Sequence, residues 1–181
     1  MKKIILLLIV LVNFVYGMNY NELLLKTQAS IFPKIILLDK KLNEKLVDEK
    51  IIYTIIYEKN DYNTAQEIRK FINTKYKGHF DKYVYEINLV EISNLSNKTK
   101  ATAIYMLNSN KGIEKVANIA KEKGIIAFSY DINNLKQGLL FSLMLEKSTV
   151  LYINKENLYI QKVDFIDSLL QIVKFMKANN S

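Results

Sequence analysis

Apolar and polar positions along the chain follow two periods, one typical of buried strands and one typical of amphipathic helices. Continuous apolar runs rich in β-branched and aromatic residues are typical of strands buried on both faces. Such runs, together with one segment that alternates apolar and polar residues, occur at 51–57, 83–92, 101–107 and 125–128. Residues 65–76 and 113–120 instead place apolar side chains at helical spacing. Strands that alternate with helices predict an α/β sheet with right-handed crossovers.

The helix boundaries are predicted from capping residues and from proline. Residues 20–32 are apolar on one face and Pro33 follows them, so we expect a helix that ends before the proline. Thr64 and Glu67 have the spacing of a capping box at the start of the second helix. Ser109 precedes the third helix, and we expect it to cap that helix.

The segment after Gly124 has a specific order of signals. Asp131 follows the strand at 125–128, where its carboxylate can accept hydrogen bonds from the free N–H groups of a helical turn. Gly138 suits a tight bend, because positive φ costs a glycine least. Two apolar runs follow, at 139–145 and 149–153, and the short polar break between them predicts an antiparallel hairpin.

The end of the chain is predicted to be helical. Asn154 can close the last strand by bonding its own backbone. The segment Lys155–Gln161 is compatible with a helical turn or with another strand. Residues 165–176 carry one apolar stripe, with acidic residues at its start and lysines at its end, which indicates an amphipathic helix. In all, we expect one domain built on a sheet of about five or six strands, mostly parallel with a C-terminal antiparallel hairpin, flanked by helices.

The segment 125–176 resembles the C-terminal half of the YfiR-like family of periplasmic proteins. Ser129, Asp131, Leu135 and Gly138 fit the first part of the family pattern. The pair Ile153-Asn154 fits its hairpin end, and the pair Leu169-Leu170 fits its final helix. Upstream, Ile31-Phe32-Pro33 is similar to the aromatic-proline end of the family's first helix.

The chain also departs from this family in three places. One glycine of the usual pair is absent, Phe32 stands where the family has tryptophan, and there is no cysteine. The resemblance is close over 125–176 and loose elsewhere. It favours the helical turn for Lys155–Gln161.

The resemblance implies a compartment and a type of partner. Members of the family act in the periplasm, and the best-known type restrains an inner-membrane diguanylate cyclase, an enzyme of cyclic-di-GMP signalling, by binding its periplasmic part. Related genes lie beside sensor kinases. The motif positions Ser129, Asp131, Gly138, Asn154 and the Leu169-Leu170 pair are structural, so we expect them to support the fold and not catalysis.

The N-terminus predicts export independently. Lys2 and Lys3 precede an apolar run at 4–12, and Val15-Tyr16-Gly17 has small residues where a signal peptidase cleaves. We expect a signal peptide at 1–17 and a periplasmic domain at 18–181 without stable membrane insertion. The alternative is an uncleaved anchor, although the apolar run is shorter than the roughly 20 residues that span a bilayer.

Charge and composition limit the classes of partner that the protein can bind. The formal net charge is +8, and loss of Lys2 and Lys3 with the signal peptide lowers it by two. This excess favours an anionic partner or membrane surface, but lysine and glutamate are interspersed and no long run of like charge occurs. We therefore favour a solvated lysine-rich surface and expect no nucleic-acid partner. The sequence leaves open whether the chain forms a homodimer.

The chain offers little for catalysis. It has one histidine, His79, in a polar turn, and no cysteine, so ordinary zinc sites are excluded. No Gly-x-Ser-x-Gly elbow presents a serine. The loop 107–112 can hold an anion at a helix start, and Glu58 and Asp61 flank a strand end where ligands bind in α/β sheets, but both signals are weak. We expect no catalytic, cofactor-binding or metal-binding residues.

Three classes of function remain. The first is a non-enzymatic periplasmic regulator that binds the periplasmic part of an inner-membrane signalling protein, either a diguanylate cyclase or a sensor kinase. The second is a periplasmic module that binds a small ligand or solute. The third, a hydrolase with an unfamiliar site, has the weakest support.

Overall fold

The computed structural model describes residues 20–109 and 111–176 and shows an α/β fold with a mixed sheet. Within these residues the sheet has eight strands in the order β2-β3-β1-β4-β5-β6-β7-β8. The strands are β1 (Ile51–Tyr57), β2 (His79–Phe80), β3 (Tyr83–Glu91), β4 (Ala103–Met106), β5 (Ile126–Ser129), β6 (Phe141–Leu145), β7 (Thr149–Asn154) and β8 (Lys174–Met176).

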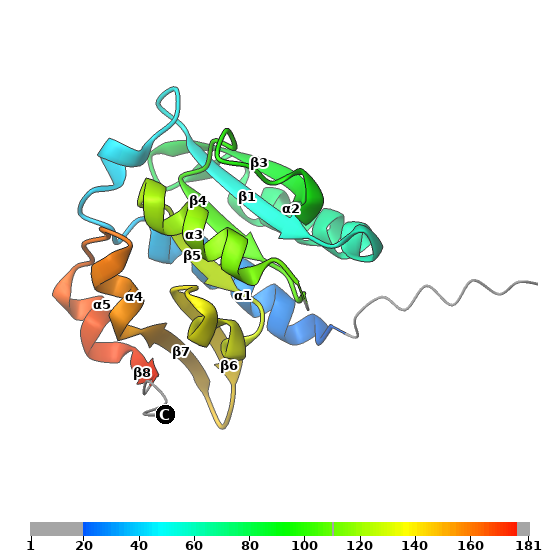
Figure 1. Cartoon of the computed structure of the whole chain (residues 1–181). Helices are drawn as coiled ribbons and strands as arrows, with labels where there is room; N and C mark the ends of the chain where they lie inside the picture. Colours follow the sequence, from blue (N-terminus) through cyan, green and yellow to red (C-terminus); the bar gives the residue numbers. More distant parts are fainter. Residues whose placement is uncertain (1–19, 110, 177–181) are drawn as a thin grey trace, which may run out of the picture.

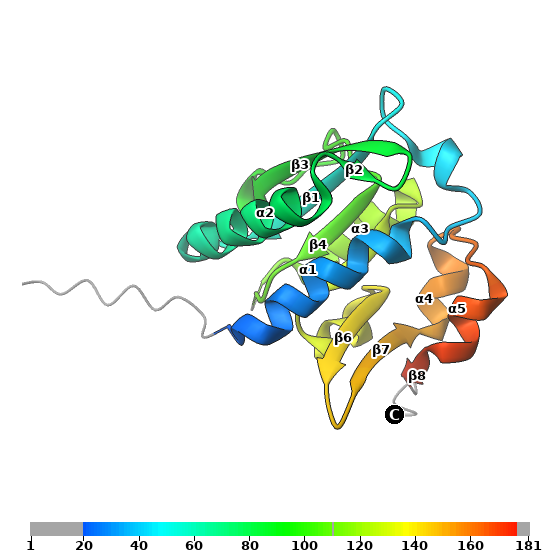
Figure 2. The ribbon, with the colours of Figure 1, turned by 180° about the vertical axis from the view of Figure 1, so that it is seen from behind.

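Helices connect these strands. The α-helices are α1 (Glu22–Ile36), α2 (Tyr62–Tyr76), α3 (Ile113–Lys123), α4 (Lys155–Ile160) and α5 (Asp167–Ile172). Short 3₁₀ helices are η1 (Leu42–Lys45), η2 (Lys59–Asp61), η3 (Ile92–Asn94) and η4 (Ile132–Gln137). Figure 1 shows α3 in front of β4 and β5, and Figure 2, from behind, shows α1 and α2 covering the opposite face.

The central strands β3, β1, β4, β5 and β6 are parallel to one another. β6 and β7 form an antiparallel hairpin, β8 adds to β7 in parallel, and β2 adds to β3 in antiparallel. β3 follows β1 in the chain and lies on one side of it in the sheet. The chain then crosses to β4, which lies on the other side of β1. This reversal of strand order lies between β1 and β4, and in open α/β sheets ligands bind outside the carboxyl ends of the strands at such a point.

Two apolar clusters hold the layers together, one on each face of the sheet. The first joins α1, α2 and α5 to the sheet, and the second joins α3 and η4 to it. In the first cluster, Phe32 of α1 stacks on Phe128 of β5 with ring centroids 4.4 Å apart. Phe128 also stacks on Phe141 of β6 at 5.7 Å, and Phe141 meets Phe165 edge-on at 5.1 Å. Aromatic pairs of this geometry stabilise a core beyond their burial.

Helix α1 does not end at Pro33 as predicted. It continues through Pro33 to Ile36. The proline lacks the N–H that would bond the carbonyl of Ala29, but Ile35 and Ile36 are almost fully buried. Their packing outweighs the missing hydrogen bond, so the prediction was wrong.

Two predicted helix caps are also wrong. Helix α2 begins at Tyr62, immediately after η2, so Thr64 and Glu67 lie inside it and form no capping box. Helix α3 begins after Gly112, whose φ of +77° a glycine adopts easily, and Ser109 lies three residues before that. In both places the turn before the helix takes a conformation that the local spacing of polar residues does not reveal.

The C-terminal tail is only partly helical. Helix α5 ends at Ile172, and Lys174–Met176 form β8 beside β7. The hydrogen bonds that the edge of β7 offers are not visible in the sequence of the tail. With β2, this strand brings the sheet to eight strands, more than the five or six predicted. The segment Lys155–Gln161 is helical through Ile160, as the resemblance favoured.

No helix among the described residues is long and apolar enough to cross a membrane. The predicted signal peptide at 1–17 lies outside the described residues.

Candidate functional site

Four of the predicted motif positions come together around η4. The Asp131 carboxylate accepts from the N–H of Asn133 at 2.8 Å and caps η4, as predicted. The Ser129 hydroxyl donates to the carbonyl of Asp131 at 2.8 Å. Gly138 ends η4 with a φ of +106°, and a Cβ there would lie 2.8 Å from that of Ala117.

Asn154 joins the same network from the end of β7. Its Oδ1 accepts from the N–H groups of Glu156 and Asn157 at 2.9 and 3.2 Å, which caps α4. Its Nδ2 donates to the carbonyl of Leu135 in η4 at 2.8 Å. Asn154 therefore lies at the end of β7, caps the start of α4 and ties both to η4.

Buried amide side chains complete this network, and the sequence analysis missed them. Asn134 donates to the Ser129 hydroxyl at 3.0 Å. Asn157 donates to the carbonyls of Leu135 and Leu139, and Gln161 donates to that of Gly138. The spacing of these residues could have revealed two of them, because Asn157 and Gln161 are one helical turn apart and so lie on the same side of a helix. The amide nitrogens of Asn134, Asn157 and Gln161 all donate to protein groups and so support the fold. The buried Oε1 of Gln161 has no hydrogen-bond partner among the described residues.

The Leu169-Leu170 pair lies away from this network, on α5. Leu169 is buried against α1 and Leu170 is partly buried at the same cluster. The pair therefore belongs to the core, on the side of the sheet where α5 meets α1.

A second group of polar residues meets where the strand order reverses, at the carboxyl ends of β1 and β4. The Tyr20 hydroxyl lies 2.9 Å from Oδ2 of Asp61, to which it donates, and accepts from the N–H of Asn108 at 3.1 Å. The Tyr20 ring meets the ring of Tyr130 edge-on, with centroids 4.8 Å apart. The Tyr130 hydroxyl accepts from the N–H of Asn21 at 2.9 Å. The start of α1 is thus fastened to the carboxyl ends of β1 and β4.

Burial and the Asp61 carboxylate determine the acidity of Tyr20. Burial raises the pKa of its hydroxyl far above the ordinary value for tyrosine, and the negative charge of Asp61 raises it further. Tyr20 is therefore a neutral hydrogen-bond donor at physiological pH.

Glu58 and Ser109 lie beside this group. The Ser109 hydroxyl bonds to Oε1 of Glu58 and accepts from the N–H of Lys111 at 3.1 Å. The structure thus brings Ser109, which the sequence analysis treated as a separate helix cap, to the strand end that Glu58 and Asp61 flank. Ser109 fastens the loop after β4 to the end of β1.

An apolar groove lies along the second half of α1. It has a volume of about 420 Å³. Its walls come from α1, the hairpin of β6 and β7, and α5, through Ile31, Lys34, Ile35, Leu38, Leu143, Thr149, Leu151, Leu169 and Ile172. Ile172 stands at its rim with 74% of its surface exposed. Exposed apolar surface of this kind, rimmed by polar residues, marks interaction sites.

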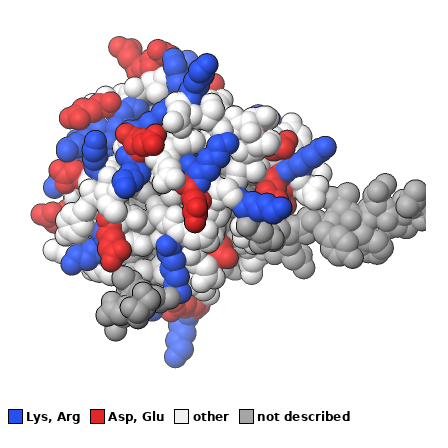
Figure 3. Space-filling view, viewed as in Figure 1, with Lys and Arg blue, Asp and Glu red and all other residues white. Residues whose placement is uncertain are grey.

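One lysine lines the groove, and a second lies close in sequence to one of the residues that line it. The first is Lys34, and the second is Lys147, in the hairpin turn just before Thr149. Neither lysine forms an ion pair with a residue that the structure describes. Elsewhere, on the face shown in Figure 3, acidic and basic side chains are intermingled, in agreement with a solvated surface of mixed charge.

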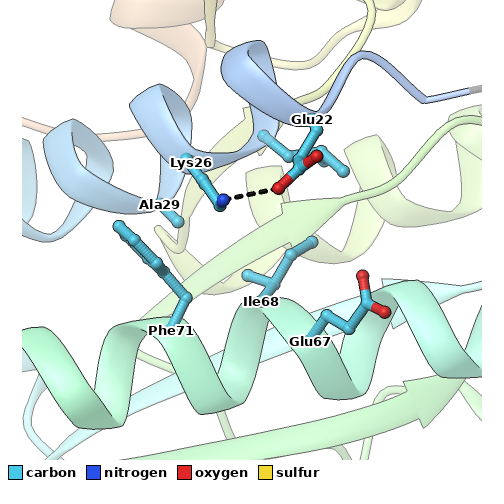
Figure 4. A pocket seen from close by; sticks show the side chains of 7 residues that line it. Glu22, Lys26, Ala29, Glu67, Ile68 and Phe71 are labelled. Carbon is cyan, nitrogen blue, oxygen red and sulfur yellow. Dashed lines mark hydrogen bonds and ion pairs between the residues drawn. The ribbon is translucent and has the colours of Figure 1, made fainter.

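A smaller gap separates α1 from α2 (Figure 4). Its volume is about 60 Å³, enough for about two water molecules. Lys26 forms an ion pair with Glu22 across its mouth at 2.5 Å, and Phe71 and Ile68 of α2 face Ala29 of α1. The gap is an imperfection of helix packing and holds no ligand-sized space.

Metal ligands do not cluster in the described part of the chain. No group of three or more His, Asp and Glu side chains there is placed to hold a metal ion. His79 is exposed and lies in the short strand β2, where the sequence predicted a polar turn.

Comparisons with known proteins identify the fold. No protein-family model matches the chain, and no curated protein shows a significant match, so the resemblance to the YfiR-like family stays a prediction. A conserved domain protein from Vibrio cholerae superimposes with a TM-score of 0.60 at 13% identity, over 84% of this chain and 60% of that one. The ABC domain from Streptococcus pneumoniae, solved in complex with L-Trp, has a TM-score of 0.53 at 12% identity, over 84% of this chain and 61% of that one. This chain therefore spans less than two thirds of either protein, and the likeness concerns the fold alone.

Proposed function

We propose that the protein is a non-enzymatic periplasmic regulator of the YfiR-like type. It binds the periplasmic part of an inner-membrane signalling protein, a diguanylate cyclase or a sensor kinase, and holds it in one activity state. The observation that carries this proposal is the apolar groove between α1, the β6–β7 hairpin and α5, with the exposed side chain of Ile172 at its rim.

The chemistry of the groove suits a protein segment. Exposed apolar anchors beside a pocket provide most of the affinity at protein interfaces. Lys34 adds positive charge to the lining of the groove, so the expected occupant is an apolar segment of the partner flanked by acidic residues. Binding shifts the partner between its states only if the groove fits one state better than the other.

A pair of matched variants tests this proposal. Ile172 and Tyr159 are equally exposed at 74%, but only Ile172 lines the groove. We expect Ile172→Asp to abolish capture of the signalling protein by crosslinking in intact cells, and to change cyclic-di-GMP or kinase output as deletion of the gene does. Tyr159→Asp should leave both unchanged. Equal effects of the two variants, or no captured signalling protein with the native chain, would refute the proposal.

A second candidate function is binding of a small polar ligand at the carboxyl ends of β1 and β4. Tyr20, Glu58, Asp61 and Ser109 meet there, at the position where ligands bind in sheets of this topology. A solved protein of similar fold is in complex with L-Trp. Because Tyr20 bonds to Asp61 and Asn108 at these strand ends, a ligand would have to displace it, and Tyr20→Ala should bind such a ligand more tightly than the native chain does. Thermal-shift screening of both chains against amino acids and other small solutes tests this, and no shift in either would exclude it.

A further inference from the structure

The outer edge of β3 is largely unpaired. On its inner side β3 pairs with β1 from Tyr85 to Glu91. On its outer side β2 pairs only with Tyr83 and Val84, and one further bond runs from the N–H of Tyr85 to the carbonyl of Gly78. Figures 1 and 2 show β3 at the border of the sheet, with β1 inside it.

Strand geometry identifies the free backbone groups. Successive residues of a strand direct their N–H and C=O groups to opposite sides. Since the N–H of Tyr85 is directed outward to Gly78, those of Ile87, Leu89 and Glu91 are directed outward as well. None of these three residues has a backbone hydrogen bond on that side with any residue that the structure describes. Such an edge is a template for pairing with another strand.

We propose that a second copy of this chain pairs with this edge, β3 against β3 in antiparallel, about a two-fold axis at Leu89. In this register Leu89 lies opposite Leu89 of the second copy, and Ile87 lies opposite Glu91 of the second copy. All of the outward N–H and C=O groups from Ile87 to Glu91 then form hydrogen bonds. The two sheets become one continuous sheet.

The register is self-complementary in shape and charge. β2 begins beside Val84, and Gly78 before it bonds to Tyr85, so the proposed pairing from Ile87 to Glu91 lies beyond both. Leu89 is partly buried against the core and would meet its own copy. No like charges lie directly opposite each other, an arrangement that would destabilise a strand pair.

Helix α2 supplies a charge partner. Asn73 of α2 accepts a hydrogen bond from the Tyr85 hydroxyl at 3.1 Å, so this side of α2 lies over the outer part of β3. Arg69, the single arginine of the chain, is one turn earlier on the same side and forms no ion pair with a described residue. By helix geometry it lies about 6 Å further along α2 from Asn73, toward the part of β3 that holds Ile87, where Glu91 of the second copy would stand. Arginine and carboxylate form strong paired hydrogen bonds across interfaces.

Charge reversal tests this arrangement. The mature chain, residues 18–181, is examined by analytical ultracentrifugation over a range of concentrations. We expect a dimer whose dissociation constant rises about tenfold or more in Arg69→Glu and in Glu91→Arg, because both symmetry-related pairs become repulsive. The double reversal should return it to within about threefold of the native value. Circular dichroism confirms that each variant is folded. A native chain that stays monomeric, or a double reversal without recovery, would overturn the proposal.

A single introduced cysteine tests the register itself. The chain has no cysteine, so Leu89→Cys adds a unique thiol on the proposed axis. Hydrogen-bonded residues in antiparallel strands have Cα atoms about 5.5 Å apart, within the range of a disulfide. We expect rapid oxidation to a covalent dimer. Val84→Cys is the control, because Val84 is 43% exposed on the same strand but far from its own copy in this register. Crosslinking of Val84→Cys as fast as Leu89→Cys would disprove the register.

Discussion

Individual polar side chains hold the C-terminal half of this molecule in register. Asn154 caps α4 through two N–H groups and bonds the carbonyl of Leu135 through its amide nitrogen. Asp131 caps only η4. Because Asn154 bonds to more backbone groups than Asp131 does, we expect it to contribute more to stability.

Replacement of these two residues should therefore have unequal effects. We expect Asp131→Ala to lower the free energy of unfolding by about 1 kcal/mol, the usual contribution of a helix cap. Asn154→Ala should lower it by about 2 kcal/mol, since the hydrogen bond from its amide nitrogen to the carbonyl of Leu135 is also lost, although Asn157 still donates to that carbonyl. Urea denaturation measures both values.

Asn154→Asp is the matched control for this comparison, because it keeps the cap oxygen and loses only the donor. We expect its stability to lie between those of the native chain and Asn154→Ala. Partner binding by the folded variants should not change. A variant of Asp131 or Asn154 with native stability and no partner binding would contradict their structural role.

At the scale of elements, the sequence predicted what local patterning determines. The strand at 51–57 was identified because it is apolar throughout, and the hairpin because a polar break separates two apolar runs. The predicted C-terminal end of α1 and the predicted helix at the end of the chain were wrong. Both depend on contacts between residues far apart in the sequence, namely the burial of Ile36 and the pairing of the tail with the edge of β7. Neither the groove nor the Tyr20–Asp61 pair follows from spacing, since each joins residues far apart in the chain.

The strand at the end of the chain is testable by hydrogen exchange. In an edge strand that pairs on one side only, alternate N–H groups bond to the neighbour and the others face solvent. We therefore expect Lys174, Phe175 and Met176 to alternate between slow and fast exchange in NMR spectra. A continuation of α5 would instead protect consecutive amides, so uniform protection there would contradict β8.

For the whole molecule, tyrosine burial makes stability sensitive to alkaline pH. Burial raises the pKa of Tyr53 and Tyr105 well above the ordinary value of 10.0. The unfolded chain therefore loses these protons first as the pH rises. The stabilisation is complete below about pH 10 and is lost above it.

We expect the free energy of unfolding to be steady from neutral pH to about pH 9 and to fall beyond pH 10 by about 1.4 kcal/mol per pH unit for each buried tyrosine. Denaturation at a series of pH values, followed by tyrosinate absorbance, measures this. Tyr53→Phe should lessen the fall, and its hydroxyl has no hydrogen-bond partner among the described residues. An unchanged pH profile in Tyr53→Phe would contradict this account.

Helix α1 connects the two candidate sites. Tyr20, just before the first turn of α1, bonds to the carboxyl ends of β1 and β4, and the second half of the helix lines the groove. Between them the buried Gln28 accepts from the Tyr105 hydroxyl at 2.5 Å and donates to the carbonyls of Tyr130 and Leu143, so the helix has one preferred position. A solute that displaced Tyr20 would also move α1, the helix that forms part of the proposed partner-binding groove. By thermodynamic reciprocity that partner would then change the affinity for the solute by an equal factor, so the two candidate sites would be coupled through α1.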